Sequence, residues 1–388
     1  MITNNRIYLD NNATTQVDPV VLEEMLPYFT AIYGNAASID HEYGVEAKNG
    51  VDTARLRIAR AINAHSDEII FTSGATESNN LALIGIAEKH AKKGNHIITC
   101  STEHKAILDT CHRLEKLGFE ITYLPVDNTG LIDLKMLESK IKRETILVSI
   151  MAANNEIGTL APLAEIGKVT RKNGILFHTD AAQAFGHIPL DVEKFNIDVM
   201  SMSAHKIYGP KGVGAIYRRG SNPRVMMAPL IYGGGHEKGL RSGTLNVPGI
   251  VGFGKAAEIA HANLHSEAER DRKWTARLLE SIRQDFPDVQ LNGHHSQRLP
   301  NNLNISIPGL ESKALIVSLK DIAISTGSAC TTSTVEPSHV ILALGYGEDR
   351  SHSALRISVG RFNSDEQISL AINELKQSLK RVLSMVQH

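Results

Sequence analysis

Short apolar runs alternate with helix-like segments along the first half of this chain, and this alternation limits the folds available to it. The predicted strands cover residues 68–72, 96–99, 120–124, 146–150, 175–178 and 197–200. Segments with apolar residues at helical spacing separate most of these strands. Such alternation is typical of a mostly parallel sheet whose two faces are covered by helices. We therefore predict an α/β fold built around a mostly parallel central sheet.

The alternation of strands and helices weakens near residue 249, which predicts a second domain. Two long helical segments follow, at residues 250–286 and 365–386. They enclose strand-like pieces at residues 303–307 and 355–359. We expect a large domain over residues 16–255 and a smaller α+β domain formed by residues 1–15 together with residues 256–388.

Composition and charge argue against several classes of function. The 388 residues carry a formal net charge of −1, which gives no large basic surface and no expected direct contact with nucleic acid. No apolar stretch approaches the ~18 residues that a membrane span needs. The three cysteines form no C-x-x-C pair, and no histidine or cysteine spacing indicates a metal site, so we expect a cytoplasmic protein without metal.

Polar residues follow the predicted strands where each strand ends. In an open α/β sheet, ligands bind beyond the carboxyl ends of the strands. Gly74, Ala75 and Thr76 follow the strand at 68–72 and open a helix, which offers backbone N–H groups and a hydroxyl to an anion. An ordinary helix cap by Thr76 is the simpler alternative. Later strand ends are followed by His104, Asn155, Asp180, Gln183, Ser203, His205 and Lys206.

Lys206 lies at a strand end, in a loop of small residues that continues into Gly209 and Pro210. A lysine beside a hydroxyl and an imidazole is placed for Schiff-base chemistry, although a solvated loop lysine is the alternative. An anion site, a carboxylate, an imidazole and this lysine are together the parts that a pyridoxal phosphate enzyme needs. In that interpretation the lysine binds the cofactor covalently, Asp180 keeps the pyridine nitrogen protonated, and His104 stacks on the ring.

Several longer motifs resemble those of the cysteine desulfurases of the IscS/NifS type. They are the stretches at residues 72–77, 102–105, 154–158, 203–206, 233–237 and 241–244. The resemblance extends from about residue 9 to residue 361. Because these desulfurases are fold-type I enzymes, it implies pyridoxal 5′-phosphate as cofactor, L-cysteine as substrate and a homodimer.

The resemblance also implies roles for individual residues. Lys206 would hold the cofactor and move the Cα proton of the substrate, and His104 would also transfer protons. Asp180 would pair with the pyridine nitrogen, and Gln183 would contact the phenolic oxygen. The remaining implied residues are Gly74, Ala75, Thr76, Ser203 and His205 around the phosphate, Thr244 from the other subunit, and Asn155 and Arg356 on the amino acid.

Cys330 differs from the other two cysteines in its surroundings. Hydroxyl residues dominate residues 325–334, which predicts a surface loop and a thiol able to ionise and act as a nucleophile. Cys100 and Cys111 are interpreted instead as small buried hydrophobes. The stretch 327–330 resembles the one that carries the catalytic cysteine of the desulfurases. The resemblance implies that Cys330 receives sulfur as a persulfide, leaving alanine, and passes it to an acceptor protein.

The destination of the sulfur is open to two interpretations. Residues 41–48 and 319–321, with Thr326, resemble the DndA-type and SspA-type desulfurases that supply sulfur for DNA phosphorothioate modification. The chain also stops at residues 386–388, without the tail by which IscS-type enzymes hold the iron–sulfur scaffold protein. We expect a dedicated donor for phosphorothioation. The alternatives are a general donor for iron–sulfur clusters or tRNA thiolation, another pyridoxal phosphate enzyme such as an aminotransferase or a selenocysteine lyase, and a scaffold without cofactor.

Overall fold

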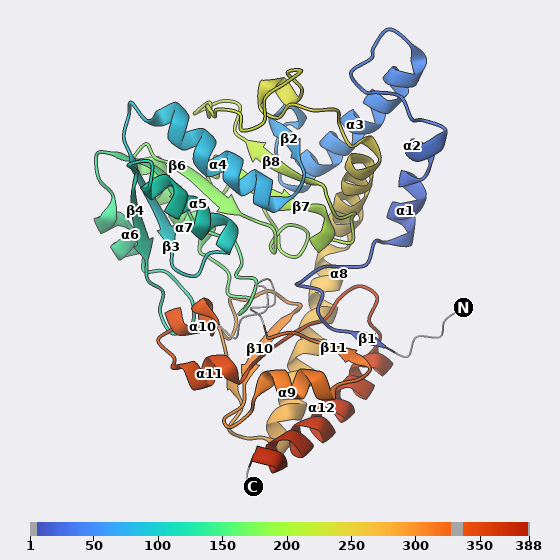
Figure 1. Ribbon diagram of the computed structural model, residues 1–388, viewed down its shortest axis with the longest axis vertical. Coiled ribbons are helices and arrows are strands. Elements are labelled where there is room, and N and C mark those ends of the chain that lie inside the picture. Colours follow the sequence, from blue (N-terminus) through green and yellow to red (C-terminus); the bar gives the residue numbers. More distant parts are fainter. Residues whose placement is uncertain (1–5, 327–336, 387–388) are drawn as a thin grey trace.

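The computed structural model describes residues 6–326 and 337–386, which form two lobes joined by a long helix (Figure 1). The larger lobe contains a seven-stranded sheet with the order β2-β8-β7-β6-β5-β3-β4. Its strands are β2 (Ile69–Thr72), β3 (His96–Cys100), β4 (Glu120–Leu124), β5 (Thr145–Ser149), β6 (Leu176–Asp180), β7 (Val199–Ser203) and β8 (Gly214–Arg218). Only β8 runs antiparallel to its neighbours within this sheet, so the predicted mostly parallel sheet is confirmed.

Helices cover both faces of this sheet. Successive strand residues point to opposite faces, so neighbouring residues of one strand pack against different helices. Ile69 and Phe71 pack with α3 (Glu42–Ala61), α7 (Leu163–Lys172) and α8 (Val247–Asp285) on one face. Ile70 packs with α4 (Ala75–His90) and α5 (Lys105–Glu115) on the other. The outer elements of this lobe are α1 (Pro19–Met25), α2 (Pro27–Thr30) and α6 (Leu134–Lys140).

Helix α4 begins at Ala75, six residues before the start suggested by its apolar spacing. The first turns contain polar residues, and two of them, Ser78 and Asn79, are fully buried. An amphipathic pattern does not detect a helix end whose buried residues are polar. The consequence is functional, because the N-terminus of α4 lies at the edge of the sheet where the predicted site residues gather.

The smaller lobe combines the C-terminal part of the chain with its N-terminal strand. One of its sheets is antiparallel and contains β9 (Gln290–Leu291), β10 (Asn302–Ser306) and β12 (Ala354–Ser358). In the other sheet, β1 (Ile7–Tyr8) pairs in parallel with β11 (Ile322–Ala323). Its helices are α9 (Ser312–Ser318), α10 (His339–Ala343), α11 (Glu348–His352) and α12 (Asp365–Val386). Ile7 and Leu9 share one apolar core with Ile305 and Leu355, so the two ends of the chain form one unit.

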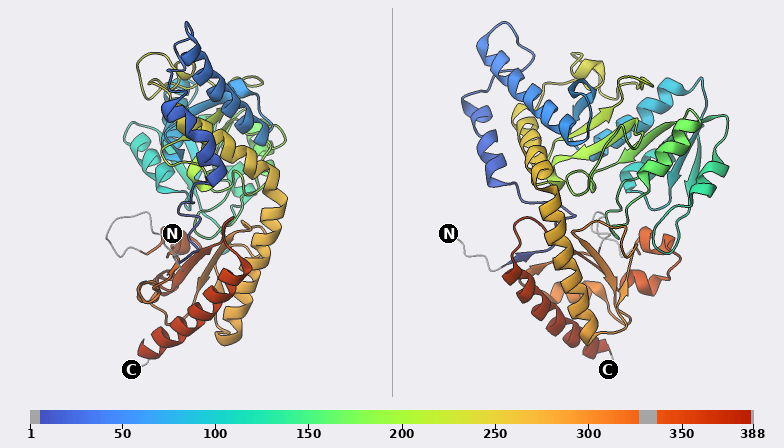
Figure 2. Two further views of the ribbon diagram at one scale, coloured as in Figure 1. Left: turned by 90° about the vertical axis from the view of Figure 1, so that its right-hand side faces the viewer. Right: turned by 180° about the vertical axis from the view of Figure 1, so that it is seen from behind.

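Helix α8 is continuous through both lobes (Figures 1 and 2). Phe253 and Ala257, in its first half, belong to the core of the large lobe. Trp274 and Leu278, in its second half, belong to the core of the small lobe. The proposed domain division at residues 255 and 256 thus falls inside this one helix.

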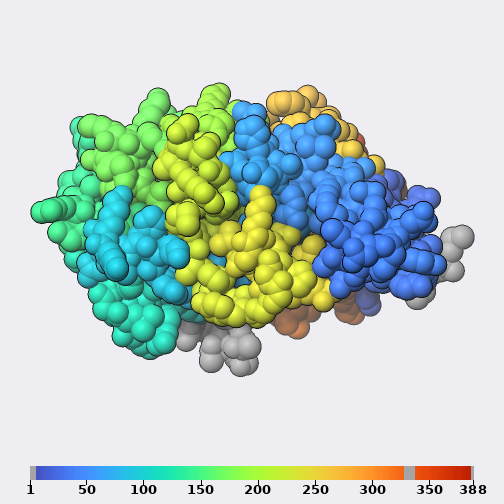
Figure 3. All heavy atoms as spheres, turned by 90° about the horizontal axis from the view of Figure 1, so that it is seen from above, coloured from blue at the N-terminus to red at the C-terminus, as the bar shows by residue number. Residues whose placement is uncertain are grey.

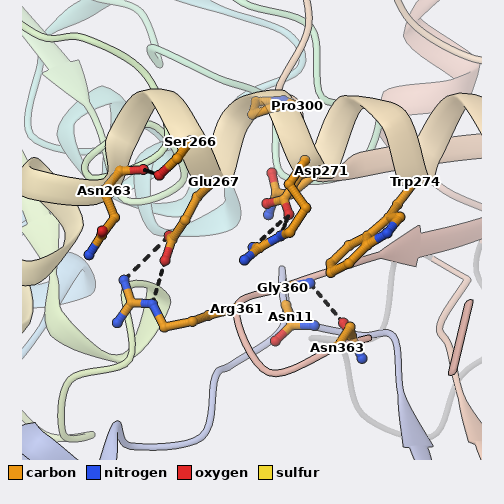
Figure 4. A network of polar contacts seen from close by, with 12 residues as sticks. Asn11, Asn263, Ser266, Glu267, Asp271, Trp274, Pro300, Gly360, Arg361 and Asn363 are labelled. Atoms are coloured by element: carbon orange, nitrogen blue, oxygen red, sulfur yellow. Dashed lines mark hydrogen bonds and ion pairs between the residues drawn. The ribbon is translucent and has the colours of Figure 1, made fainter. Parts of the chain in front are cut away.

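Arg361 connects the small lobe to α8 and to the large lobe. Its guanidinium forms an ion pair with Glu267 of α8 at 2.6 Å (Figure 4). It forms a second ion pair with Asp18, the N-cap of α1, at 2.9 Å. The guanidinium also lies 4.3 Å from the ring centroid of Tyr208, whose hydroxyl accepts the Arg361 backbone N–H at 2.6 Å. Tyr208 has a φ of 67°, which a bulky residue rarely adopts. These contacts hold that backbone in place two residues after Lys206.

Within residues 6–326 and 337–386, no helix is both long and apolar enough to cross a membrane. No cluster of three or more histidine, cysteine, aspartate or glutamate side chains there is arranged to hold a metal ion.

Candidate active site

A cavity of about 480 Å³ lies at the carboxyl-end edge of the large sheet. The predicted cofactor residues that line it are Gly74, Ala75, Thr76, His104, Asp180, Gln183, Ser203, His205 and Lys206. The predicted substrate residues Asn155 and Arg356 line it as well. Thr244 is exposed and is not among the described residues that line this cavity, and Cys330 lies outside the described residues.

One end of the cavity has the features of an anion site. Gly74 precedes α4 with a φ of 154°, a conformation that glycine adopts without strain, and the positive end of the helix dipole faces the cavity. His205 contributes an imidazole whose Nδ1 lies 3.1 Å from the Thr14 hydroxyl. Burial, together with the smaller effect of the nearby positive charges of Lys206 and Lys211, lowers the pKa of His205 to about 4. A neutral imidazole still offers one N–H to a phosphate.

Asp180 ends β6 and points into the cavity while almost fully buried. One carboxylate oxygen accepts the Ala182 backbone N–H at 2.9 Å, and the other accepts the Asn79 amide at 2.7 Å. A carboxylate has lone pairs for about four hydrogen bonds, so it can accept a further donor from the cavity. The N–H group of a protonated ring nitrogen could donate this further hydrogen bond to Asp180.

The N-terminal segment 11–15 covers the lysine loop. Lys206 Nζ donates to the backbone oxygens of Asn12, at 2.5 Å, and Ala13, at 2.8 Å. The Gln183 amide donates to the Asn12 oxygen at 2.8 Å. Sequence reasoning assigned this segment only to the smaller domain and missed its contribution to the site. The available signal was a run of small polar residues directly after a strand.

His104 is the N-cap of α5, and this position fixes its ring. Its Nδ1 accepts the Ala106 backbone N–H at 3.1 Å, which assigns a neutral ring's proton to Nε2. Behind it, Glu103 is fully buried and accepts the Met151 backbone N–H at 2.7 Å. Burial raises the pKa of Glu103 well above its usual range, and the negative charge of Asp180 adds to this effect. Both effects favour the neutral acid form of Glu103 beside the cavity.

Arg356 lies on β12 with its side chain almost completely buried. Its guanidinium donates to Asp10 at 2.8 Å and to the Asn155 backbone oxygen at 3.0 Å. Its Nε–H has no hydrogen-bond partner among the described residues. A planar guanidinium with donors left over suits a carboxylate ligand. Asp10 is a second residue that sequence reasoning missed, and it also accepts the Ser325 hydroxyl at 3.0 Å.

His178 connects three strands beneath the cavity. Its ring lies 2.9 Å from the Ser149 hydroxyl of β5 and 3.0 Å from the Ser201 hydroxyl of β7. Full burial lowers its pKa to about 3. The ring is therefore neutral in the folded protein across the physiological range.

This burial predicts a loss of stability in acid. Below pH 6.5 the unfolded chain protonates His178 while the folded protein does not, so the free energy of unfolding falls as the pH decreases toward 3. Between pH 6.5 and about pH 4.5, His178 alone accounts for about 2 kcal/mol. Urea unfolding of His178→Gln should show a flatter acid limb, whereas the exposed control His265→Gln should keep the wild-type slope. Equal slopes in all three proteins would refute this assignment.

The fold and the residues gathered at the cavity define a class, the pyridoxal phosphate enzymes of fold type I. The lysine amine fits the reactive carbon of this cofactor, and the hydrogen-bonded carboxylate fits its ring nitrogen. The helix N-terminus fits the phosphate, and the fixed imidazole fits the face of the ring. Residues 7–370 match the aminotransferase class-V family. The chain belongs to this family and, by the relatives below, to its cysteine desulfurases, so the predicted enzyme class and pyridoxal phosphate dependence are confirmed.

Similar proteins cover nearly the whole chain. Cysteine desulfurase IscS of Rickettsia rickettsii (strain Iowa) is 49% identical over 379 residues, which span 98% of this chain and 92% of that protein. A solved NifS-like protein superposes with a TM-score of 0.90 at 39% identity, covering 97% of this chain and 100% of the other. A solved structure of SspA in complex with cysteine has a TM-score of 0.81 at 38% identity, covering 92% and 99%.

Proposed function

We propose that the protein converts L-cysteine to L-alanine and transfers the sulfur to Cys330. In this reaction the Cβ–S bond of the substrate breaks and an S–S bond to Cys330 forms, so one cysteine and one thiol yield one alanine and one persulfide. The observation that carries the proposal is the buried guanidinium of Arg356 in the same cavity as Lys206 and Asp180. A carboxylate site beside that lysine suits an amino acid.

The residues around the cavity have different roles in the proposed reaction. Pyridoxal phosphate, when bound, withdraws electrons from the Cα of the amino acid and weakens the bonds around it. Arg356 and Asn155 hold the substrate carboxylate, Lys206 moves the proton at Cα, and His104 is a second proton carrier. The Cys330 thiolate attacks the substrate sulfur.

The remaining predicted residues hold the cofactor. Thr76, Ser203 and His205 bind its phosphate, Gln183 contacts its phenolic oxygen, and Asp180 pairs with its ring nitrogen. Two of these roles have direct support in the geometry. The neutral His205 ring retains a donor for phosphate, and Asp180 retains lone pairs for the nitrogen.

We also propose a homodimer in which Thr244 reaches the phosphate of the other subunit. Figure 3 views the face on which the N-terminal helices α1–α3 and residues 220–245 lie side by side. These segments carry many of the exposed large apolar side chains: Leu22, Leu26, Phe29, Tyr33, Tyr43, Ile231 and Tyr232. A large exposed apolar patch supports an interface between proteins, and Thr244 lies exposed in the same segment as Tyr232.

L-cysteine tests the activity directly. We expect the purified, cofactor-loaded protein to release alanine and sulfide in equal amounts in the presence of a reductant. Its visible absorption should change as soon as cysteine is added. An absorption change with neither product would move the function to another amino acid. Parallel assays with L-selenocysteine would separate a desulfurase from a selenocysteine lyase.

Two pathways that could receive the sulfur are each supported by a similarity of this chain. The resemblance of residues 41–48 to the DndA-type and SspA-type enzymes favours a dedicated donor for DNA phosphorothioation. The 49% identity with an IscS over almost the whole chain favours a general donor. In either pathway the neutral net charge favours a protein acceptor over direct contact with DNA, and we place the enzyme in the cytoplasm.

A gene deletion in the source organism separates the two pathways. A dedicated donor predicts loss of DNA phosphorothioates with normal activity of iron–sulfur enzymes. A general donor predicts that iron–sulfur enzymes lose activity or that tRNA thiolation falls. Transfer of labelled sulfur from the persulfidated protein to purified candidate acceptors then identifies the partner.

A further inference from the structure

Asn79 is a fully buried amide at the wall of the cofactor cavity. Its Nδ2 donates to Asp180 Oδ2 at 2.7 Å. Its Oδ1 has no hydrogen-bond partner among the described residues. The contact with Asp180 fixes the orientation of the amide, because the opposite orientation would place two acceptor oxygens against each other.

The unpaired oxygen of Asn79 is unfavourable for stability. A buried acceptor without a partner costs folding free energy, and an apolar side chain of similar volume would avoid that cost. Leucine has nearly the shape of asparagine and would fill the same place. The presence of an amide at this position, despite its unsatisfied oxygen, is therefore explained by its hydrogen bond to the Asp180 carboxylate.

Helix α4 also connects Asn79 with the anion site. Gly74 caps the helix at the predicted phosphate position, and Asn79 follows just over one turn later. One rigid element thus carries the phosphate donors and the amide that holds Asp180.

We propose that Asn79 is a positioning residue for Asp180. The amide holds one carboxylate oxygen and so fixes the rotation of the carboxylate. Together with the Ala182 N–H, it keeps the carboxylate charged and directed at the ring nitrogen of pyridoxal phosphate. The inference rests on the assignment of this cofactor and does not depend on which amino acid is the substrate.

The test compares two cofactors in the variant Asn79→Leu. Pyridoxal phosphate presents a protonated ring nitrogen to Asp180, whereas its 1-deaza analogue has a C–H group in that place. We expect the dissociation constant of pyridoxal phosphate to rise about 10- to 100-fold, the range for loss of a hydrogen bond to a charged group. The dissociation constant of the deaza analogue should change less than about 3-fold, because this analogue makes no hydrogen bond to Asp180.

The neighbouring residue supplies a matched control. Asn80 donates to the Thr76 backbone oxygen at 2.9 Å and accepts the Thr110 hydroxyl at 3.0 Å, so it makes no contact with Asp180. Asn80→Leu should weaken both cofactors equally or neither. If Asn79→Leu does not fold, Asn79→Asp keeps the size but places a second carboxylate against Asp180, and it should weaken the natural cofactor selectively.

Three results would overturn the inference. The first is unchanged binding of pyridoxal phosphate by Asn79→Leu, and the second is equal weakening of both cofactors. The third is a wild-type protein that binds neither cofactor, which would also overturn the cofactor assignment. A failure of the proposed cysteine chemistry is distinguishable, because these measurements use no amino acid.

Discussion

Replacing Lys206 by alanine should reduce kcat for L-cysteine by about 10³-fold or more, because the variant loses both the covalent attachment of the cofactor and the base at Cα. The cofactor should still bind, since the helix N-terminus of α4 and Asp180 are unchanged. Borohydride reduction followed by mass spectrometry provides an independent readout. In the wild-type protein the cofactor should become attached to the peptide that contains Lys206, whereas the variant should carry no attached cofactor.

A surface lysine controls for loss of positive charge. Lys172 forms an exposed ion pair with Glu138, and Lys172→Ala should keep wild-type kcat and the reduced cofactor adduct. A Lys206→Ala protein that retains turnover, or a wild-type adduct on another lysine, would contradict the assignment. The hydrogen bonds of Lys206 to residues 12 and 13 would then serve only to hold the N-terminal segment.

Replacing Cys330 by alanine should reduce sulfide release on the order of 10³-fold, as expected for loss of a catalytic nucleophile. The visible spectrum of the bound cofactor and its initial response to L-cysteine should persist, because substrate binding uses other residues. Quantified sulfide, alanine and protein-bound persulfide measure the effect. Desulfuration that continues in this variant would place the nucleophile elsewhere.

The other two cysteines are natural controls for this experiment. Cys100 and Cys111 are buried, which confirms the sequence prediction for both. Burial raises the pKa of Cys100 to about 11 and that of Cys111 to about 12, so neither forms a thiolate at neutral pH. Cys100→Ala and Cys111→Ala should therefore retain persulfide formation on Cys330.

The sequence predicted much of the large lobe because its signals are local. An apolar strand followed by a polar residue is visible in a short window, and parallel strands bring such residues to one edge without further information. Asp180 and Lys206 were identified in this way, and both line the cavity. The helix opening at Gly74–Thr76 was predicted from its position after the strand at 68–72, whereas apolar spacing alone does not mark the start of α4, because Ser78 and Asn79 are buried polar residues.

Residues that reach the cavity from distant parts of the chain were beyond such reasoning. Asp10 contacts Arg356 across 346 positions of sequence, and Asn12 contacts Gln183 across 171. No spacing rule connects partners at such separations, because their contact depends on the tertiary arrangement of segments that lie far apart in the sequence. The resemblance to a family supplied Arg356, but it did not supply the carboxylate that holds it.

The pairing of β1 with β11 constrains how the enzyme matures during synthesis. Ile7 lies beside Ile322, and Asp10 bonds to Arg356, so the first strand has no partner until almost the whole chain has left the ribosome. Domains generally fold in the order of translation, which allows the large sheet to form first. Asn11 and Asn12 also bond to Ser358 of β12, so the segment that covers the lysine loop gains its full set of contacts only with the last strands. Capture of the cofactor in its final geometry is therefore an event that follows translation.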